Sequence, residues 1–167
     1  MKIMGIAGWS GSGKTTLVVS VLPRLIGMGL KVSTLKHAHH DFDLDKPGKD
    51  SYEHRHAGAM EVVVASARRW ALFHELNGES EPTIEQLTQR MGPADLLLVE
   101  GFKRYTHPKI EVHRPSVGKP LLQPDDAHIV AVASDVPLDG LGAPRLDLND
   151  IAGIASFIVD HCGLKAA

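Results

Sequence analysis

A glycine-rich stretch near the start of the chain constrains the fold more than any other feature. Residues 8–16 read GWSGSGKTT, and the phosphate-binding pattern G-x-x-x-x-G-K-[ST] begins at Gly8 and ends at Thr15. An apolar run at 3–7 precedes the glycines, and apolar residues at helical spacing follow them to about residue 29. Because strand, loop and helix occur in this order, we predict a P-loop that binds the phosphates of a nucleoside triphosphate.

Each part of the pattern has a chemical task. Glycines let successive backbone N–H groups converge on one anion, and the following helix directs the positive end of its dipole at the same point. Lys14 is expected to reach the β- and γ-phosphates, Thr15 to offer its hydroxyl to Mg²⁺, and Thr16 to lie near the α-phosphate. The predicted nucleotide-binding residues of this loop are Gly8, Ser10, Gly11, Ser12, Gly13, Lys14, Thr15 and Thr16.

A carboxylate is expected beside the loop. P-loop proteins hold Mg²⁺ through an acid at the end of a neighbouring apolar strand. The run LLLVE ends in Glu100, and Gly101 then permits a tight turn, whereas Asp95 begins the run and would lie at the opposite end. We therefore expect Thr15 and Glu100 to serve the Mg²⁺ ion.

The base-reading residue is less well defined. The chain lacks the Asn-Lys-x-Asp pattern of many guanine-binding P-loop proteins. Asp135 follows another apolar run and is positioned to accept two N–H donors from guanine, but it also suits an ordinary acid at the start of a loop. Spacing alone leaves GTP and ATP open.

Residues 36–59 form the most unusual segment, KHAHHDFDLDKPGKDSYEHRHAGA. Three interpretations compete: a switch loop that supplies acids to Mg²⁺ and cations to phosphates, a transition-metal site built on His37, His39, His40 and Asp41, or a solvated loop with no role. The candidate second-ligand or switch residues are Lys36, His37, His40, Asp43, Asp45 and Lys49, with Lys103 from the sequence EGFK.

The alternation of strand-like and helix-like segments predicts an α/β fold of the P-loop NTPase type, with a mostly parallel sheet flanked by helices. The runs 61–66 and 69–75 are expected to form a hairpin and so add antiparallel strands, and 109–114 alternates like an edge strand. Capping residues are expected at Asp50 or Ser51 and, with a capping box, at Thr83. No linker is visible, so residues 1–167 are interpreted as one nucleotide-binding domain.

Composition excludes several classes of protein. The net charge of −2 provides no global basic field for nucleic acid. No stretch reaches the roughly 18–20 apolar residues of a membrane span, and the lone Cys162 excludes an internal disulfide. We expect a soluble, cytoplasmic protein with no nucleic-acid or membrane partner.

Five segments together resemble the MobB family of molybdopterin-guanine dinucleotide biosynthesis adapter proteins: GWSGSGKTTL, KHAHHDFDLDKPGKDSYEHRHAGA, VVVASARRWAL, LLLVEGFK and IVAVASDVPL. The resemblance covers about residues 3–160. It implies a fold similar to metallochaperone GTPases, binding of GTP with Mg²⁺, weak hydrolysis, and a homodimer that shares an extended sheet. It also implies that the protein assists the guanylyltransferase MobA and binds molybdopterin or molybdopterin guanine dinucleotide. The finished cofactor would then be transferred to molybdoenzymes or their chaperones.

Two other functions remain open on the residues alone. A small-molecule kinase would need an arginine-rich lid, for which Arg68, Arg69 and Arg114 are the candidates. A metallochaperone would need a metal motif, and Cys162 has no cysteine partner in the chain. The sequence identifies no catalytic residue: no glutamine or arginine is clearly placed to orient water, so any hydrolysis should be slow.

Overall fold

The computed structural model of the protein describes residues 1–38, 42–102 and 105–165. The chain divides into two compact units, where the sequence suggests one domain: Met1–Ala38 together with Pro93–Ala167, and His39–Gly92. We call them the sheet unit and the hairpin unit and describe each by itself.

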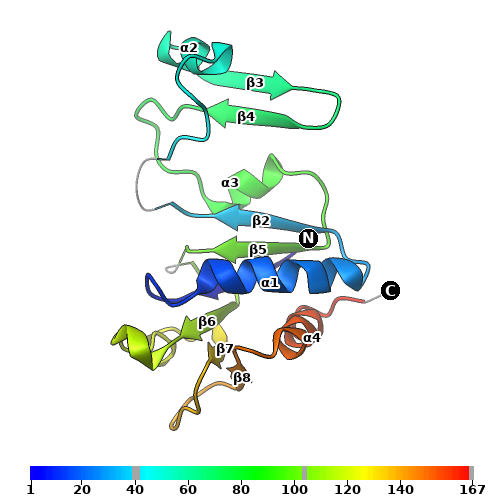
Figure 1. Ribbon diagram of the computed structural model, residues 1–167, viewed down its shortest axis with the longest axis vertical. Coiled ribbons are helices and arrows are strands. Elements are labelled where there is room, and N and C mark those ends of the chain that lie inside the picture. The colour runs from blue at the N-terminus through cyan, green and yellow to red at the C-terminus, as the bar shows by residue number, and fades with distance from the viewer. Residues whose placement is uncertain (39–41, 103–104, 166–167) are drawn as a thin grey trace. The chain divides into compact units, whose positions relative to one another are not determined.

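The sheet unit is a parallel α/β layer structure (Figure 1). Its elements are β1 (Lys2–Ala7), α1 (Lys14–Gly27), β2 (Val32–Lys36), β5 (Leu96–Glu100), β6 (Lys109–His113), η1 (Pro115–Val117), η2 (Gln123–Asp125), β7 (Ile129–Ser134), β8 (Arg145–Asp147) and α4 (Ile151–Cys162). The strand order is β2-β5-β1-β6-β7-β8, and every pairing is parallel. The predicted α/β class is confirmed.

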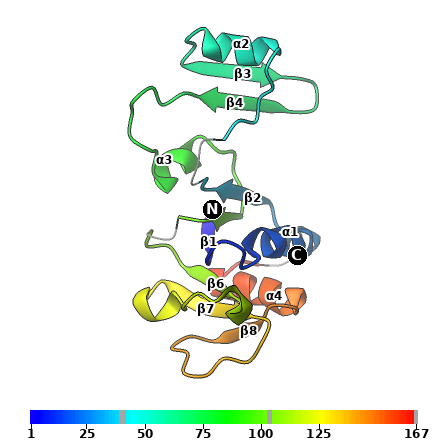
Figure 2. The same ribbon diagram turned by 60° about the vertical axis from the view of Figure 1, so that its left-hand side comes forward.

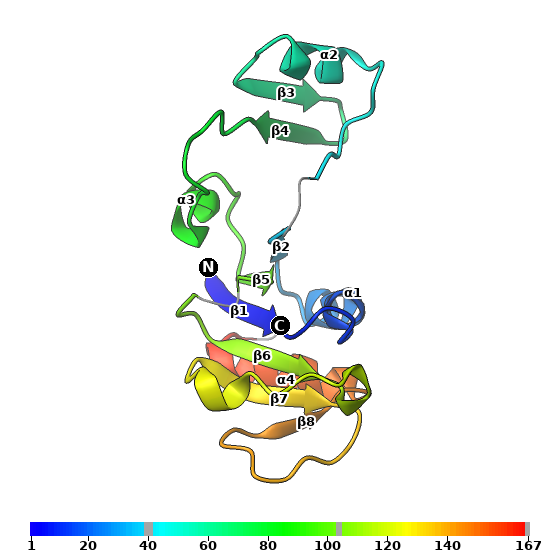
Figure 3. The ribbon, with the colours of Figure 1, turned by 90° about the vertical axis from the view of Figure 1, so that its left-hand side faces the viewer.

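The core of the sheet unit lies between the sheet and the two helices α1 and α4, which pack against each other (Figure 3). In α1, the buried residues Leu17, Val21 and Leu25 recur every four positions and so form one apolar face. From β1, Met4 and Ile6 are fully buried against the helices. Burying a side chain of this size stabilises the fold by about 1.5–3 kcal/mol, so a charge at Val21 would be incompatible with this packing.

The strand order also determines where a ligand can bind. In parallel sheets the carboxyl ends of the strands share one edge, and ligands bind in the loops beyond it. Residue pairing places Ile6 of β1 beside Glu100 of β5, and Lys36 of β2 beside the same glutamate. On the other side of β1, Ala7 pairs with Glu111 of β6. The glycine loop therefore leaves β1 between the ends of β5 and β6.

The expectation that residues 109–114 form an edge strand is wrong. This segment is β6, which lies between β1 and β7 and is buried along its whole length. Its polar residues Lys109 and Glu111 can be buried because they have partners within the fold. Lys109 Nζ lies 2.7 Å from Asp126 Oδ2, and the Glu111 carboxylate accepts the backbone N–H groups of Leu122 and Gln123, each at 2.8 Å.

The hairpin unit contains α2 (Asp50–His56), β3 (Glu61–Ala65), β4 (Trp70–His74) and α3 (Ile84–Gln89). The strands β3 and β4 pair in antiparallel register from Glu61 opposite His74 to Ala65 opposite Trp70, which confirms the predicted hairpin. Helix α2 contacts β3 (Figure 2). The Glu61 carboxylate accepts hydrogen bonds from His74 and Arg90, which lower its pKa.

The predicted helix caps had different outcomes. Thr83 caps α3, and its side chain and that of Gln86 form the expected capping box. At α2 the expectation is wrong, because the N-cap residue is Lys49 and it makes no side-chain cap. Asp50 is instead the first helical residue, where its negative charge interacts favourably with the positive end of the helix dipole. The Ser51 hydroxyl donates to Asp45 Oδ1.

Within 1–38, 42–102 and 105–165, no helix has the length and apolar character needed to span a membrane. Cys162 is buried, and this burial raises the pKa of its thiol.

Candidate functional site

The glycine loop adopts a conformation that requires glycine. It connects β1 to α1, and φ is +142° at Gly8 and +98° at Gly13, where L side chains are strained. A Cβ atom at Gly8 would lie 2.5 Å from the carbonyl oxygen of Val112, so the loop passes in direct contact with β6. Gly13 is the N-cap residue of α1. The free N–H groups of the first turn of α1 therefore face the end of this loop.

Lys14 is held against the loop. Its Nζ donates to the carbonyl oxygen of Trp9 at 2.8 Å. The backbone N–H of Ser12 donates to the same oxygen at 3.2 Å, and this second contact closes the loop on itself. The ammonium group thus lies beside a concave backbone segment with a helix N-terminus at its end, an arrangement that favours an anion with several charges.

Thr15 and Glu100 come together as predicted for a Mg²⁺ site. The Thr15 hydroxyl donates to Glu100 Oε1 at 2.7 Å, and Lys36 Nζ lies 3.5 Å from the same oxygen. Hydroxyl and carboxylate oxygens are the hard donors that Mg²⁺ prefers, and Mg²⁺ is commonly held by one carboxylate together with substrate phosphates. These residues therefore fit the ion. Lys36, predicted as part of the switch loop, adds a cation beside them.

His37 follows β2 at the same edge of the sheet. Its backbone N–H donates to the carbonyl oxygen of Glu100 at 2.9 Å, and its ring centroid lies 4.7 Å from that of Phe102. A Cβ atom at Gly101 would lie 2.9 Å from His37 Cβ, so the turn after β5 packs closely on this histidine. His37 thus supports the turn that follows the predicted Mg²⁺ acid.

Asp135 directly follows β7 and forms an ion pair with Arg114. The guanidinium of Arg114 forms an ion pair with Asp135 through Nη1, and its Nε donates to the carbonyl oxygen of Ser12 at 3.1 Å. From the sequence, Arg114 was a candidate only for the lid of a kinase, and this role is new. Nothing in the local sequence indicates this contact, because it depends on β6 lying between β1 and β7.

Trp9 is a second residue of the site that the P-loop pattern does not specify. Its indole Nε1 donates to the carbonyl oxygen of Pro120 at 2.8 Å, and Lys119 Nζ lies 5.9 Å from the ring centroid. The segment after β6 is thereby anchored on the P-loop. An aromatic residue inside a glycine loop was the signal that could have identified this contact.

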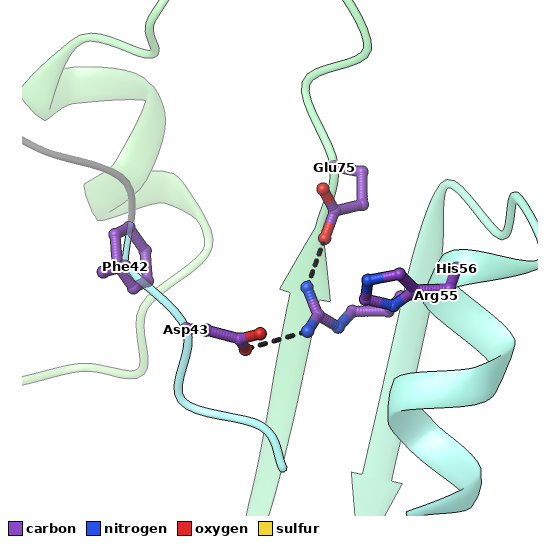
Figure 4. Close-up of a pocket in the computed structure, with 5 residues that line it drawn as sticks. All are labelled: Phe42, Asp43, Arg55, His56 and Glu75. Carbon is purple, nitrogen blue, oxygen red and sulfur yellow. Dashed lines mark hydrogen bonds and ion pairs between the residues drawn. The ribbon is translucent and has the colours of Figure 1, made fainter. Parts of the chain in front are cut away.

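In the hairpin unit, Arg55 binds the predicted switch residue Asp43 and also Glu75 (Figure 4). Asp43 and Glu75 accept hydrogen bonds from Arg55 at 2.8 and 2.7 Å. Asp45 Oδ2 lies 3.6 Å from Arg55 Nε. The hydrogen bond to Glu75 is the main reason why the pKa of Arg55 is raised, burial opposes it, and the charges of Asp43, Glu75 and Asp45 add to it. In this conformation the acids neutralise Arg55.

A cavity of about 350 Å³ lies beside this cluster and is lined by Phe42, Asp43, Arg55, His56 and Glu75. The other predicted residues of the segment are placed differently: Lys49 is the N-cap residue of α2, and His40 lies outside the described residues, as does Lys103. Among the residues that the structure describes, no group of three or more His, Cys, Asp or Glu could hold a metal ion. The transition-metal interpretation involves His39, His40 and Asp41, which are not described, and it stays a hypothesis.

Comparison with known proteins agrees with this architecture. The family "Molybdopterin guanine dinucleotide synthesis protein B" matches residues 3–135. The chain is 47% identical over 161 residues to the "Molybdopterin-guanine dinucleotide biosynthesis adapter protein" of Escherichia coli strain K12, covering 95% of this chain and 91% of that protein. It is 42% identical over 158 residues to the protein of the same name from Haemophilus influenzae, covering 93% and 86%.

Solved structures are similar as well. The crystal structure of a molybdopterin-guanine biosynthesis protein B (MobB) superimposes with a TM-score of 0.77 at 29% identity, covering 96% of this chain and 99% of the other. The crystal structure of Bacillus subtilis MobB gives a TM-score of 0.75 at 22% identity, covering 97% and 98%, and shows similarity of fold alone.

Proposed function

The chain belongs to the molybdopterin guanine dinucleotide synthesis protein B (MobB) family, and from that premise we propose that it is a GTP-binding adapter in the biosynthesis of molybdopterin guanine dinucleotide. The single observation that supports nucleotide binding most is the 2.7 Å hydrogen bond between Thr15 and Glu100 at the end of the glycine loop. Through this contact, two oxygen atoms of the kind that binds Mg²⁺ lie beside a backbone anion site and the ammonium of Lys14.

Each group has a defined task in this proposal. The N–H groups of the loop and of the first turn of α1 bind the phosphates, and Lys14 exchanges the carbonyl of Trp9 for phosphate oxygens. Thr15 and Glu100 hold Mg²⁺, which neutralises phosphate charge when it is bound. The preference for guanine rests on the names of the relatives, all of which refer to a guanine dinucleotide.

Hydrolysis by this site is proposed to be slow. Rapid phosphoryl transfer needs a group that orients the attacking water and a further cation that stabilises the transition state. Among the described residues of the sheet unit, Glu100 already accepts from Thr15, and Arg114 is engaged by Asp135 and the loop. A binding and delivery role therefore fits the site better than rapid turnover does.

The adapter role requires a partner. We propose that the protein works beside the guanylyltransferase MobA, which uses GTP and molybdopterin, and that molybdopterin or its guanine dinucleotide is a second ligand. Molybdoenzymes or their chaperones are proposed as recipients of the product. Nucleotide bound at the P-loop would then be supplied to the partner rather than consumed by this chain.

We further propose a homodimer built on the hairpin unit. A two-stranded sheet is marginally stable by itself, and β3 and β4 expose large apolar side chains, with Val63 62% and Trp70 66% exposed. Pairing with the same strands of a second copy would extend this sheet, and packing of the second copy against the strand faces would cover these side chains. In sedimentation experiments, Val63→Lys with Trp70→Ser should then shift the mass from dimer to monomer.

The adapter proposal is tested by titrating purified MobA with this protein in the presence of GTP and Mg²⁺, GDP and Mg²⁺, or no nucleotide. We expect a complex whose affinity depends on the nucleotide and on Lys14. A MobA complex that is indifferent to nucleotide and to Lys14→Ala would contradict the role of the P-loop in the adapter function. Failure to form any complex would contradict the partnership.

A further inference from the structure

One arginine joins the loops that follow three adjacent strands. Arg114 comes directly after β6, the strand between β1 and β7. Its Nε donates to the carbonyl oxygen of Ser12, in the loop after β1, at 3.1 Å. Its Nη1 forms an ion pair with Asp135, the first residue after β7. The side chain of Arg114 is one-third exposed, so the guanidinium is partly shielded from solvent while it makes these contacts.

The contact with Ser12 controls the direction of an amide in the phosphate loop. A trans peptide unit is planar, and its C=O and the following N–H point in opposite directions. When Arg114 holds the carbonyl of Ser12, the N–H of Gly13 must therefore point away from the arginine. The guanidinium also lies against Gly13, because a Cβ atom there would be 3.5 Å from Arg114 Nε.

Gly13 needs such a constraint. Its φ of +98° is a conformation that glycine adopts without steric penalty, but glycine is equally free to leave it. A peptide plane that rotates freely would present its N–H to an anion only part of the time, and ordering it would cost affinity. A charged hydrogen bond to the Ser12 carbonyl fixes the plane before any ligand binds.

We propose that Arg114 is a positioning residue that preorganises the P-loop for phosphate, and that Asp135 contributes to nucleotide binding by holding Arg114. This inference rests on the proposed nucleotide-binding function. Asp135 thereby acts on the part of the site that binds phosphate. Its contribution to affinity should therefore be about the same for guanine and adenine nucleotides. The guanidinium is suited to this task because its rigid fork donates in two directions at once, which the ammonium of lysine does not do in a fixed geometry.

The test is a double-mutant cycle on the full-length protein with Arg114→Gln, Asp135→Asn and both together. Affinities for GTP and ATP, each with Mg²⁺, are measured by titration calorimetry below the unfolding temperature of every variant. Arg145→Gln is the matched control, because Arg145 is an exposed arginine of β8 in the same unit. Arg114→Lys serves as the conservative variant that keeps the charge.

We expect Arg114→Gln to weaken GTP and ATP binding by the same factor, about tenfold, which corresponds to about 1.4 kcal/mol and is close to the smallest contribution of a charged hydrogen bond. Arg114→Lys should recover part of this loss, and the double variant should bind no worse than Arg114→Gln alone. The N–H resonance of Gly13 should broaden or shift in Arg114→Gln but not in Arg145→Gln. A role in stability alone would change the unfolding temperature and leave the affinities and this resonance unchanged.

Three results would overturn the inference while the wild type still binds nucleotide. These are unchanged affinity in Arg114→Gln, additive losses in the double variant, or an Asp135→Asn effect confined to GTP, which would assign Asp135 to direct reading of guanine. Absence of binding by the wild-type protein would instead contradict the proposed function itself, so the two failures are distinguishable.

Discussion

The hydroxyl of Thr15 and the carboxylate of Glu100 meet at 2.7 Å, although 85 residues separate them in the chain. Thr15 stands in the first turn of α1 and Glu100 at the end of β5, so this contact joins the phosphate loop to the strand beside it. The parallel register of β1 and β5, which pairs Ile6 with Glu100, produces the contact. The site is thus a consequence of strand order rather than of local sequence.

Neutralising this acid should remove the metal dependence of binding. In Glu100→Gln, we expect the affinity for GTP to become nearly independent of Mg²⁺ between zero and millimolar concentrations, because the amide is a poor substitute for a carboxylate ligand. The measurement is a nucleotide titration at several Mg²⁺ concentrations. Glu85→Gln, the same change at an exposed position of α3, should behave like the wild type. Full Mg²⁺ dependence in Glu100→Gln would exclude the proposed ligand role.

Gly8→Ala should destabilise the fold far more than an alanine at another glycine with positive φ. At Gly8 the new Cβ would lie 2.5 Å from the Val112 carbonyl oxygen, whereas at Gly140, with φ +69°, it would meet nothing within 4 Å. We expect a loss of about 3 kcal/mol or more in the free energy of unfolding for Gly8→Ala, and about 1 kcal/mol for Gly140→Ala, where only backbone strain applies. Denaturant titration compares the two, and equal losses would show that the contact with β6 is unimportant.

The ion pair between Lys109 of β6 and Asp126 should make stability depend on acid. Burial of Asp126 by itself raises its pKa, but hydrogen bonds from Lys109 and from the backbone of His128 outweigh it, so the folded pKa lies below the ordinary 3.8. A carboxyl group with a lowered folded pKa contributes stability above its unfolded pKa and loses it as the pH falls through the folded value. The wild type should therefore lose this contribution below about pH 4.

Thermal unfolding between pH 2.5 and 6 tests this linkage. In Asp126→Asn the fall on the acid side should be smaller than in the wild type, and at pH 6 the variant should be less stable because Lys109, only 1% exposed, loses its carboxylate partner. The expected loss at pH 6 is about 2 kcal/mol, below the usual range for a broken buried pair because Asp126 is partly exposed. Identical acid profiles would refute the assignment to Asp126.

In the hairpin unit, Arg55 should hold segment 42–56 in place. Removing the guanidinium leaves three acidic groups, Asp43, Asp45 and Glu75, without their shared cation. In Arg55→Met we expect faster amide hydrogen exchange from residue 42 to residue 56 and unchanged exchange in α4. The matched control is Arg90→Gln, which breaks the ion pair between Glu61 and a more exposed arginine. Unchanged exchange in Arg55→Met would show that the segment is ordered by other contacts.

The sequence was sufficient for those features that depend on local chemistry. The P-loop, the strand that ends in Glu100 and the capping box of Thr83 each follow from residue types at fixed spacing, and the structure contains all three geometries. They could be predicted because glycine conformations, helix capping and buried apolar runs impose the same local structure in most contexts.

Features that depend on tertiary partners outside the P-loop motif could not be predicted from the sequence. Alternating Lys109, Glu111 and His113 looked like an edge strand, because nothing local indicates that Asp126 would pair with Lys109 or that the backbone of Leu122 would donate to Glu111. The bond from Arg114 to Ser12 spans 102 residues and arises only because β6 is inserted beside β1. Strand order sets such contacts, and hydrophobic periodicity does not determine strand order.

The central claim is that backbone amides and Lys14 bind the phosphates of GTP. The most direct test is calorimetric titration of GTP with Mg²⁺ into the wild type and into Lys14→Ala, with Lys31→Ala as an exposed control in the same unit. We expect saturable binding in the wild type and in Lys31→Ala, and an affinity at least about a hundredfold lower in Lys14→Ala, because a desolvated phosphate charge then loses its partner. Equal affinity in Lys14→Ala and the wild type would contradict this claim.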